Sequence, residues 1–299
     1  MAVKFRTYNN DTRFGEDYYK LRRFLLELDD CNWHFGRWDW MITHGMLQEE
    51  APSRIGIWED GGKVVAFVAP DLTINGKCFF PYDKNYGFLH EDMIAHAKEN
   101  LSKDGKVKIL IRDGDMTFQE TASKMGFLPT QSKDCDAIYP IGDVSEIRYE
   151  LPAGFRVTSM RDDFDMFKYG QCLWKGFNHE ANGEGPFVLN RDDLPKYEGS
   201  FLRPNVNLDI KIAVAAPNGD FVSYCGMWHD PASQSALVEP VATDPAYRKM
   251  GLGRAAVLEG VKRCGELGAT RAFVDSSQQF YYRIGFRPYA TSTFWEEKA

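Results

Sequence analysis

A basic, glycine-rich segment at residues 248–253 has the residue types that bind a phosphate group. It reads Arg248-Lys249-Met250-Gly251-Leu252-Gly253 and lies between a predicted strand and a predicted helix. The first N–H groups of a helix have no partner inside it, and the helix dipole places partial positive charge there. Glycine lets an anion come close to the backbone. Because several donors converge, we expect a pyrophosphate here rather than a carboxylate.

Two other phosphate-binding motifs share parts of this pattern. Gly251-x-Gly253-x-x-Ala256 fits a loose dinucleotide fingerprint, and Asp275 lies 22 residues after Gly253. In a Rossmann fold, however, the glycine loop directly follows its strand. Here the eight residues 243–250 intervene, and too few strand–helix units follow Asp275 for an open parallel sheet. A Walker loop is excluded because no Gly-Lys-Ser/Thr follows.

The segment resembles the acetyl-CoA signature of the GNAT N-acetyltransferase superfamily, R/Q-x-x-G-x-G/A. Arg248-x-x-Gly251-x-Gly253 follows Val241-x-x-x-Pro245 in this sequence. Downstream, residues 280–286 read Phe-Tyr-Tyr-Arg-Ile-Gly-Phe and resemble the family's F-Y-x-x-x-G-F segment. The resemblance covers about residues 205–292. One departure is that residues 275–279 lack the Asn that many members carry there, so a Ser would have to take its role.

The resemblance implies which residues bind acetyl-CoA as a cosubstrate. Backbone groups of Val241 and Thr243, with Ala242 between them, would pair with the pantetheine arm. The loop and the amides that follow would hold the pyrophosphate. These residues are Arg248, Lys249, Met250, Gly251, Leu252, Gly253, Arg254 and Ala255.

The resemblance also implies an acid and a base. Tyr281 would lie near the thioester sulfur as general acid, although the adjacent Tyr282 could replace it because the register is ambiguous by one. Glu239 is the candidate base that removes a proton from the acceptor amine, directly or through water. Strict alternation would place Leu237, Glu239 and Val241 on one face of the strand. Structural roles stay open for both, Glu239 as a strand-edge charge and Tyr281 as a core aromatic residue.

Two further segments are candidates for contact with the acceptor. His179 and Glu180 follow a predicted helix where the family often contacts its acceptor, and they are second-tier base candidates. Residues 31–41 are dense in aromatic side chains. They could form the wall of an acceptor pocket, dock the other domain, or belong to the core.

The second half has a clear order of elements. Strands are predicted near residues 154–157, 210–215, 221–228, 235–242 and 271–275, with a hairpin turn at Pro217-Asn218-Gly219-Asp220. Helices are predicted at 163–177, 251–267 and 278–284, and Gly268 closes the second of these. Residues 186–204 are polar and are predicted to form a loop.

The first half repeats this order, with strands near 3–6, 55–58, 63–68 and 106–111 and helices near 15–28, 91–101 and 118–125. The fold class is therefore α+β, with tandem acyl-CoA N-acyltransferase (GNAT) domains, each a mixed, mainly antiparallel sheet flanked by helices. Residues 1–145 would form a degenerate copy and residues 152–299 the catalytic domain. Residues 81–92 lack the glycine motif and place acids at the helix start, which would repel a pyrophosphate.

Composition limits the remaining alternatives. The chain has 299 residues, 43% hydrophobic, with a net charge of −7. The acidic balance argues against nucleic acid as a partner and favours a small cationic acceptor such as an aminoglycoside or polyamine. The six cysteines and six histidines show no C-x-x-C or zinc pattern, so we expect reduced thiols and no metal. No secretory signal or membrane segment is predicted, which favours the cytoplasm.

These observations together predict an N-acetyltransferase that transfers acetyl from acetyl-CoA to the primary amine of a small-molecule acceptor. The alternative is a non-catalytic acyl-CoA-binding or regulatory module. Neither the identity of the acceptor nor the oligomeric state follows from the sequence.

Overall fold

The computed structural model describes residues 2–10, 12–29 and 33–298 of the chain. The chain divides into two compact units. The first unit contains residues 1–136, 275–277 and 288–299, and the second contains residues 137–274 and 278–287. The sequence placed the boundary between residues 145 and 152 and kept the C-terminal strand with the second domain. The division differs because the C-terminal strand pairs inside the first unit.

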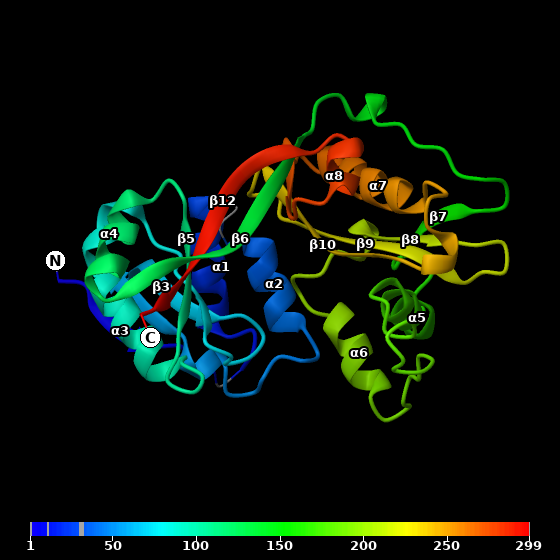
Figure 1. The fold of residues 1–299 in the computed structure, drawn as a ribbon. Helices are drawn as coiled ribbons and strands as arrows, with labels where there is room; N and C mark the ends of the chain where they lie inside the picture. Colours follow the sequence, from blue (N-terminus) through cyan, green and yellow to red (C-terminus); the bar gives the residue numbers. More distant parts are fainter. Residues whose placement is uncertain (1, 11, 30–32, 299) are drawn as a thin grey trace. The chain divides into compact units, whose positions relative to one another are not determined.

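The same order of elements occurs twice along the chain (Figure 1). The first series is β1 (Lys4–Thr7), α1 (Glu16–Leu28), α2 (Phe35–Thr43), β2 (Gly56–Asp60), β3 (Lys63–Pro70), β4 (Lys77–Phe79), α3 (His90–Asn100), β5 (Lys108–Arg112), α4 (Met116–Lys124) and β6 (Phe127–Pro140). The second is β7 (Arg156–Ser159), α5 (Met166–Gly176), α6 (Leu194–Phe201), β8 (Lys211–Ala215), β9 (Phe221–His229), β10 (Ser235–Thr243), α7 (Leu252–Glu266), β11 (Arg271–Asp275), α8 (Gln279–Arg283) and β12 (Arg287–Glu297). The predicted tandem α+β fold is confirmed.

The same strand order occurs twice. The first run is β1-β2-β3-β4-β5-β12, and the second is β7-β8-β9-β10-β11-β6. The pairs β4–β5 and β10–β11 are parallel, whereas the registers of β1–β2, β2–β3, β3–β4, β7–β8, β8–β9 and β9–β10 are antiparallel. Each sheet is completed by the last strand of the other series. This mixed topology excludes the open parallel sheet of the dinucleotide alternative.

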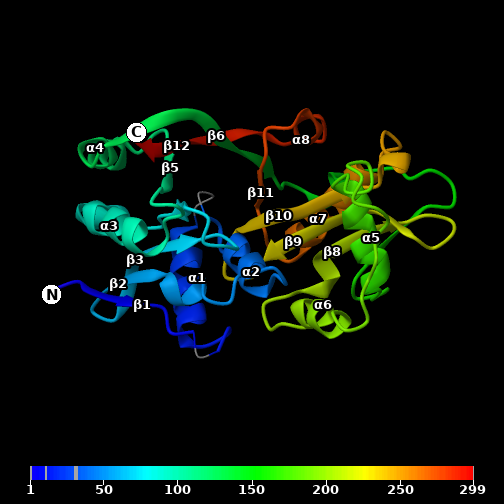
Figure 2. The same ribbon diagram turned by 60° about the horizontal axis from the view of Figure 1, so that its bottom comes forward.

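The first unit buries apolar side chains on both faces of its sheet. One core packs α1 and α2 against Phe67 and Ala69 of β3, and the other packs α3 and α4 against Ala66 and Val68 of the same strand. This alternation is that of a strand covered on both sides. Figure 2 shows β3 between α1 and α3.

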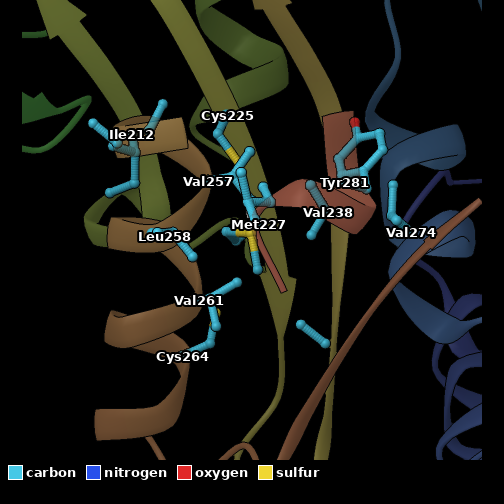
Figure 3. Close-up of a cluster of buried hydrophobic side chains, with 14 of the residues drawn as sticks. Ile212, Cys225, Met227, Val238, Val257, Leu258, Val261, Cys264, Val274 and Tyr281 are labelled. Atoms are coloured by element: carbon cyan, nitrogen blue, oxygen red, sulfur yellow. Dashed lines mark hydrogen bonds between the residues drawn. The ribbon is translucent and has the colours of Figure 1, made fainter. Parts of the chain in front are cut away.

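The second unit has α7 on one face of β8, β9 and β10 and α5 on the other (Figure 1). Figure 3 shows side chains of α7 that point toward the sheet, among them Val257, Leu258 and Val261. The positive φ of +105° at Gly268 closes this helix as predicted.

One prediction of local structure was wrong, and one helix was not predicted. Residues 186–204 contain the helix α6 rather than only loop. Proline is compatible with the first turn of a helix, and the buried side chain of Phe201 anchors this one, so the polar composition concealed it. The aromatic segment forms α2, which was not predicted as a helix.

Candidate active site

The glycine-rich loop ends in a helix N-terminus that is open to an anion. Lys249 and Gly251 have positive φ values of 66° and 83°, one on each side of Met250, and α7 begins at Leu252. The hydrogen bond from the Ala255 N–H to the Gly251 carbonyl, at 3.0 Å, closes the first turn. The N–H groups before it have no acceptor within the helix, and no side chain caps them. Backbone N–H groups in such a turn form a concave anion site.

Because Gly253 has no side chain, the start of α7 packs closely against β10 and α8. A Cβ at that position would lie 3.0 Å from Oγ1 of Thr243 and 3.5 Å from the ring of Phe280. The Thr243 hydroxyl in turn lies 2.9 Å from the hydroxyl of Ser223, which donates to the carbonyl of Ala242 at 3.1 Å. The loop, the end of β10 and α8 therefore meet at one place.

Arg248 ties the loop to its surroundings in this structure. Its guanidinium donates to the Thr243 carbonyl at 3.1 Å, the Gly176 carbonyl at 2.8 Å and Oδ1 of Asn178 at 2.9 Å. The end of α5 is thereby joined to the loop. The geometry gives Arg248 the position of a residue that orders the loop, and its contact with a phosphate stays a prediction.

The other predicted loop residues differ in exposure. Lys249 is exposed, Met250 is 39% exposed, and Arg254 donates to the carbonyl of Arg148 at 3.3 Å. The side chains of Leu252 and Ala255 are buried in the core beneath α7, so these two residues could offer a ligand only their backbone.

Strand β10 separates from β11 and carries a bulge beside the loop. The parallel register of β10 with β11 ends at the pair Leu237–Phe273. On the other side, the register with β9 shifts between Val238 and Val241, and the Glu239–Pro240 peptide bond is cis. Beyond the shift, residues 241–243 continue to pair with β9.

The edge of residues 241–243 that faces away from β9 could pair with an extended ligand. Asp244 donates its N–H to Val222 of β9 at 3.0 Å. Because backbone groups alternate along a strand, those of Val241 and Thr243 are directed away from β9. The Thr243 carbonyl accepts from Arg248, and the other groups of this pair suit the predicted contact with a pantetheine arm. That contact stays a prediction.

The expectation that Leu237, Glu239 and Val241 share one face was wrong. Val238 and Val241 both pack against the core beneath α7. The bulge inserts one extra residue between them and resets the alternation.

The side chain of Tyr281 is buried in the core beneath α7. It is 7% exposed and belongs to the core that contains Cys225, Val238 and Val274 (Figure 3). Burial raises the pKa of the Tyr281 phenol, and the charges of Cys225 and Glu239 raise it further. The phenol is therefore protonated at neutral pH, as a proton donor must be.

The charge of Glu239 acts on tyrosines on both faces of the sheet. Its charge contributes to the raised pKa of Tyr281 beneath α7 and to that of Tyr169 on α5, although burial is the largest cause for each. Tyr282 is only partly buried against the same core as Tyr281. Glu239 and Tyr281 therefore interact electrostatically, and their catalytic roles stay predictions.

The second-tier base candidates lie in a turn after α5. Nδ1 of His179 lies 2.9 Å from Oε1 of Glu184, and its ring stacks on Trp174 at 4.1 Å. Glu180 is exposed. His179 is thus engaged in a local contact, and neither residue gains support as a base.

Two residues that the sequence analysis missed support the bulge from β9. A Cβ on Gly226 would lie closer than 3.0 Å to the carbonyl oxygen of Glu239 and 3.0 Å from Cδ of Pro240. The indole N–H of Trp228 donates to that same carbonyl at 2.9 Å. A glycine inside an apolar strand signals close backbone approach, and this signal was present in the sequence.

The matching part of the first unit is built differently. A 3₁₀ helix (Lys84–Leu89) leads directly into α3, whose first turn carries Glu91 and Asp92. The aromatic side chains Trp33, Phe35 and Trp38 are buried in the core of that unit, whereas Cys31 and Asn32 lie outside the described residues. The absence of acetyl-CoA from this unit stays a prediction.

In the part of the chain that the structure describes, no group of three or more His, Cys, Asp or Glu side chains could hold a metal ion. None of the helices described has the length and apolar character needed to cross a membrane.

Comparison with known proteins gives one family. Residues 174–286 match the model of the acetyltransferase (GNAT) family. No curated protein matches the sequence.

Several solved structures share the fold over the whole chain. A GCN5-related N-acetyltransferase from Sphaerobacter thermophilus has a TM-score of 0.59 at 11% identity, over 99% of this chain and 95% of that one. A tandem GNAT protein from the clavulanic acid biosynthesis pathway has a TM-score of 0.58 at 14% identity, over 99% and 98%. An acetyltransferase of the GNAT family from Colwellia psychrerythraea has a TM-score of 0.58 at 12% identity, over 99% and 100%.

Proposed function

We propose that this chain, which carries a domain of the GNAT acetyltransferase family at residues 174–286, transfers acetyl from acetyl-CoA to a primary amine of a small acceptor. The observation that carries the proposal is the meeting of three features in the second unit. These are the uncapped N-terminus of α7, the separated edge of β10, and the pair Glu239 and Tyr281.

The proposed roles follow from this arrangement. The N–H groups at the start of α7 bind the pyrophosphate, and the edge at Val241 and Thr243 pairs with the pantetheine arm. Both contacts hold the thioester at the bulge. Holding two reactants in one complex removes much of the entropic barrier to their reaction.

The transfer itself moves protons at both reacting groups. Glu239 takes a proton from the acceptor ammonium, directly or through water, and the free amine attacks the thioester carbonyl carbon. A C–N bond forms and the C–S bond breaks. Tyr281 donates its proton to the leaving thiolate, and the nitrogen of the new amide passes its second proton through water to the Tyr281 phenolate. Glu239 releases its proton to solvent. The net charge of −7 supports a cationic acceptor such as a polyamine or an aminoglycoside.

The cofactor site can be tested by thermal unfolding with acetyl-CoA. A ligand at 100 times its dissociation constant stabilises the bound state by about 2.7 kcal/mol. We expect a rise in the midpoint for the wild type and none for Gly253→Glu, which places a carboxylate at the anion site. Gly114→Glu is the matched control, because no atom lies within 4 Å of a Cβ there. The absence of any shift in the wild type would overturn the proposal.

Turnover separates the transferase from a binding module. Thiol release from acetyl-CoA would be followed with spermidine, kanamycin and phenethylamine. Acetylation of an amine supports a transferase. A thermal shift without turnover on any amine would support the non-catalytic acyl-CoA-binding module instead.

A further inference from the structure

A series of contacts connects Lys211 of β8, Trp228 of β9 and the backbone of Glu239 of β10. In the register of the sheet, Lys211 is opposite Gly226 and Trp228 is opposite Leu237, so these contacts run diagonally across the strands. The Trp228 indole donates to the backbone carbonyl of Glu239 at 2.9 Å. A bulge removes residues from the regular ladder, and a buried carbonyl needs another donor. Trp228 provides that donor.

The ammonium of Lys211 lies over the ring of Trp228. Lys211 is only 3% exposed, and its Nζ lies 3.3 Å from the centroid of the Trp228 ring. The same ammonium donates to the carbonyl of Met227 at 2.7 Å. Lysine is almost never buried unless it is paired, and a cation on an aromatic face is attracted more strongly when both are desolvated. The buried ammonium therefore fixes the plane of the indole.

Gly226 of β9 is the third residue that supports the bulge. Any larger residue there would push against the Glu239 carbonyl. The carbonyl of Glu239 is thus held between Gly226 on one side and the Trp228 N–H on the other, which limits the movement of its backbone. That backbone sets the direction of the Cα–Cβ bond from which the carboxylate extends.

We propose that Trp228, held by Lys211, is a positioning residue that directs the carboxylate of Glu239 in acetyl transfer. The inference rests on the proposed function, because it assigns Glu239 the role of base. Trp228 touches the backbone of Glu239 and acts through it. The proposed contacts with acetyl-CoA are made by Val241, Thr243 and the start of α7, and they include neither Trp228 nor Lys211.

Trp228→Phe is the direct test, because it keeps an aromatic ring for Lys211 and removes the N–H donor together with the second ring of the indole. We expect kcat with the acetylated amine to fall by about tenfold to a hundredfold, as for a misplaced catalytic group. The dissociation constant for acetyl-CoA should stay unchanged. In a Glu239→Gln background, the same substitution should lower kcat no further. A full additional loss in that background, or an unchanged kcat in the single variant, would overturn the inference.

Trp38→Phe is the matched control. Its indole N–H donates to the carbonyl of Tyr18 at 3.3 Å in the core of the first unit. This variant loses the same kind of hydrogen bond, and we expect no change in kcat. An equal fall in kcat would show that any lost indole bond has this effect, and would overturn the positioning role.

A second readout does not require turnover. With glutamate carboxyl carbons labelled with ¹³C, the Glu239 signal is identified by its loss in Glu239→Gln. We expect its pH titration to change in Trp228→Phe and in Lys211→Met and to stay the same in Trp38→Phe. An unchanged titration in Trp228→Phe would overturn the inference. Failure of every amine in the turnover assay would overturn the proposed function alone.

Discussion

The absent side chain of Gly226 makes room for the carbonyl oxygen of Glu239. A Cβ would lie closer than 3.0 Å to that oxygen, and the other nearby atoms are the Glu239 carbonyl carbon and Cδ in the rigid ring of Pro240. The strand that carries the candidate base can therefore bulge only because its neighbour has glycine at this position.

Gly226→Ala should destabilise the protein and slow acetyl transfer together. Forcing one methyl group into a packed interior typically costs about 1–3 kcal/mol, because backbone must move. We expect a loss of this size in urea denaturation and a fall in kcat as the bulge shifts. Gly114→Ala meets no atom within 4 Å and should stay within about 0.5 kcal/mol of the wild type. Equal stability of the two variants would contradict the contact at Gly226.

Tyr281→Phe should lower kcat by about a hundredfold or more, the usual contribution of a general acid. The pKa of this phenol is raised by burial and by the charges of Cys225 and Glu239, so the proton is present throughout the neutral range. The dissociation constant for acetyl-CoA should change little, since the ring remains. Steady-state kinetics and calorimetry measure the two quantities separately.

Tyr282→Phe is the control for this prediction, and it resolves the ambiguity between the adjacent tyrosines. It should leave kcat near that of the wild type, because Tyr282 is only partly buried at the edge of the core. A greater loss in Tyr282→Phe than in Tyr281→Phe would assign the acid to Tyr282.

Arg248 and Lys249 should differ in how they affect acetyl-CoA binding. Arg248→Ala removes hydrogen bonds to Gly176, Asn178 and Thr243, so it should lower the unfolding midpoint without ligand. Lys249→Ala should leave that midpoint nearly unchanged and weaken acetyl-CoA binding, with less effect at high salt. Thermal unfolding and calorimetry at two salt concentrations test both. An undiminished midpoint in Arg248→Ala would show that its bonds do not order the loop.

The elements around the site were predictable because they are encoded locally. The turn at residues 217–220 identified the hairpin of β8 and β9, and the apolar periodicity after Gly251 identified α7. Strand β11 was predicted with its observed limits. These signals depend on neighbours within a few turns of the chain.

The features that the sequence did not predict depend on residues that are far apart in the chain. The sequence assigned residues 152–299 to one domain and could not show that β12 pairs with β5, because neither segment alone determines which strands pair. The bulge at Glu239 depends on Gly226 and Trp228, which lie on another strand. For the same reason, alternation assigned Leu237 and Val241 to one face and was wrong.

A buried histidine in the first unit should make stability depend on pH. His90 is 1% exposed, its ring stacks on Phe118 at 4.2 Å, and neither ring nitrogen has a hydrogen-bond partner among the described residues. Burial lowers the pKa of His90, and it also lowers that of His96. In the unfolded chain both imidazoles titrate near the reference value of about 6.5.

The sign of this effect follows from which state binds the proton more tightly. Above the unfolded pKa neither state is protonated, and stability is at its full value. As the pH falls below about 6.5, the unfolded chain takes up protons that the folded chain resists, so the free energy of unfolding decreases. We expect the urea midpoint to fall between about pH 7.5 and pH 5. His90→Phe keeps the stacking on Phe118 and should remove part of this fall, with the remainder due to His96. An equally steep fall in His90→Phe would show that its ring does not resist protonation.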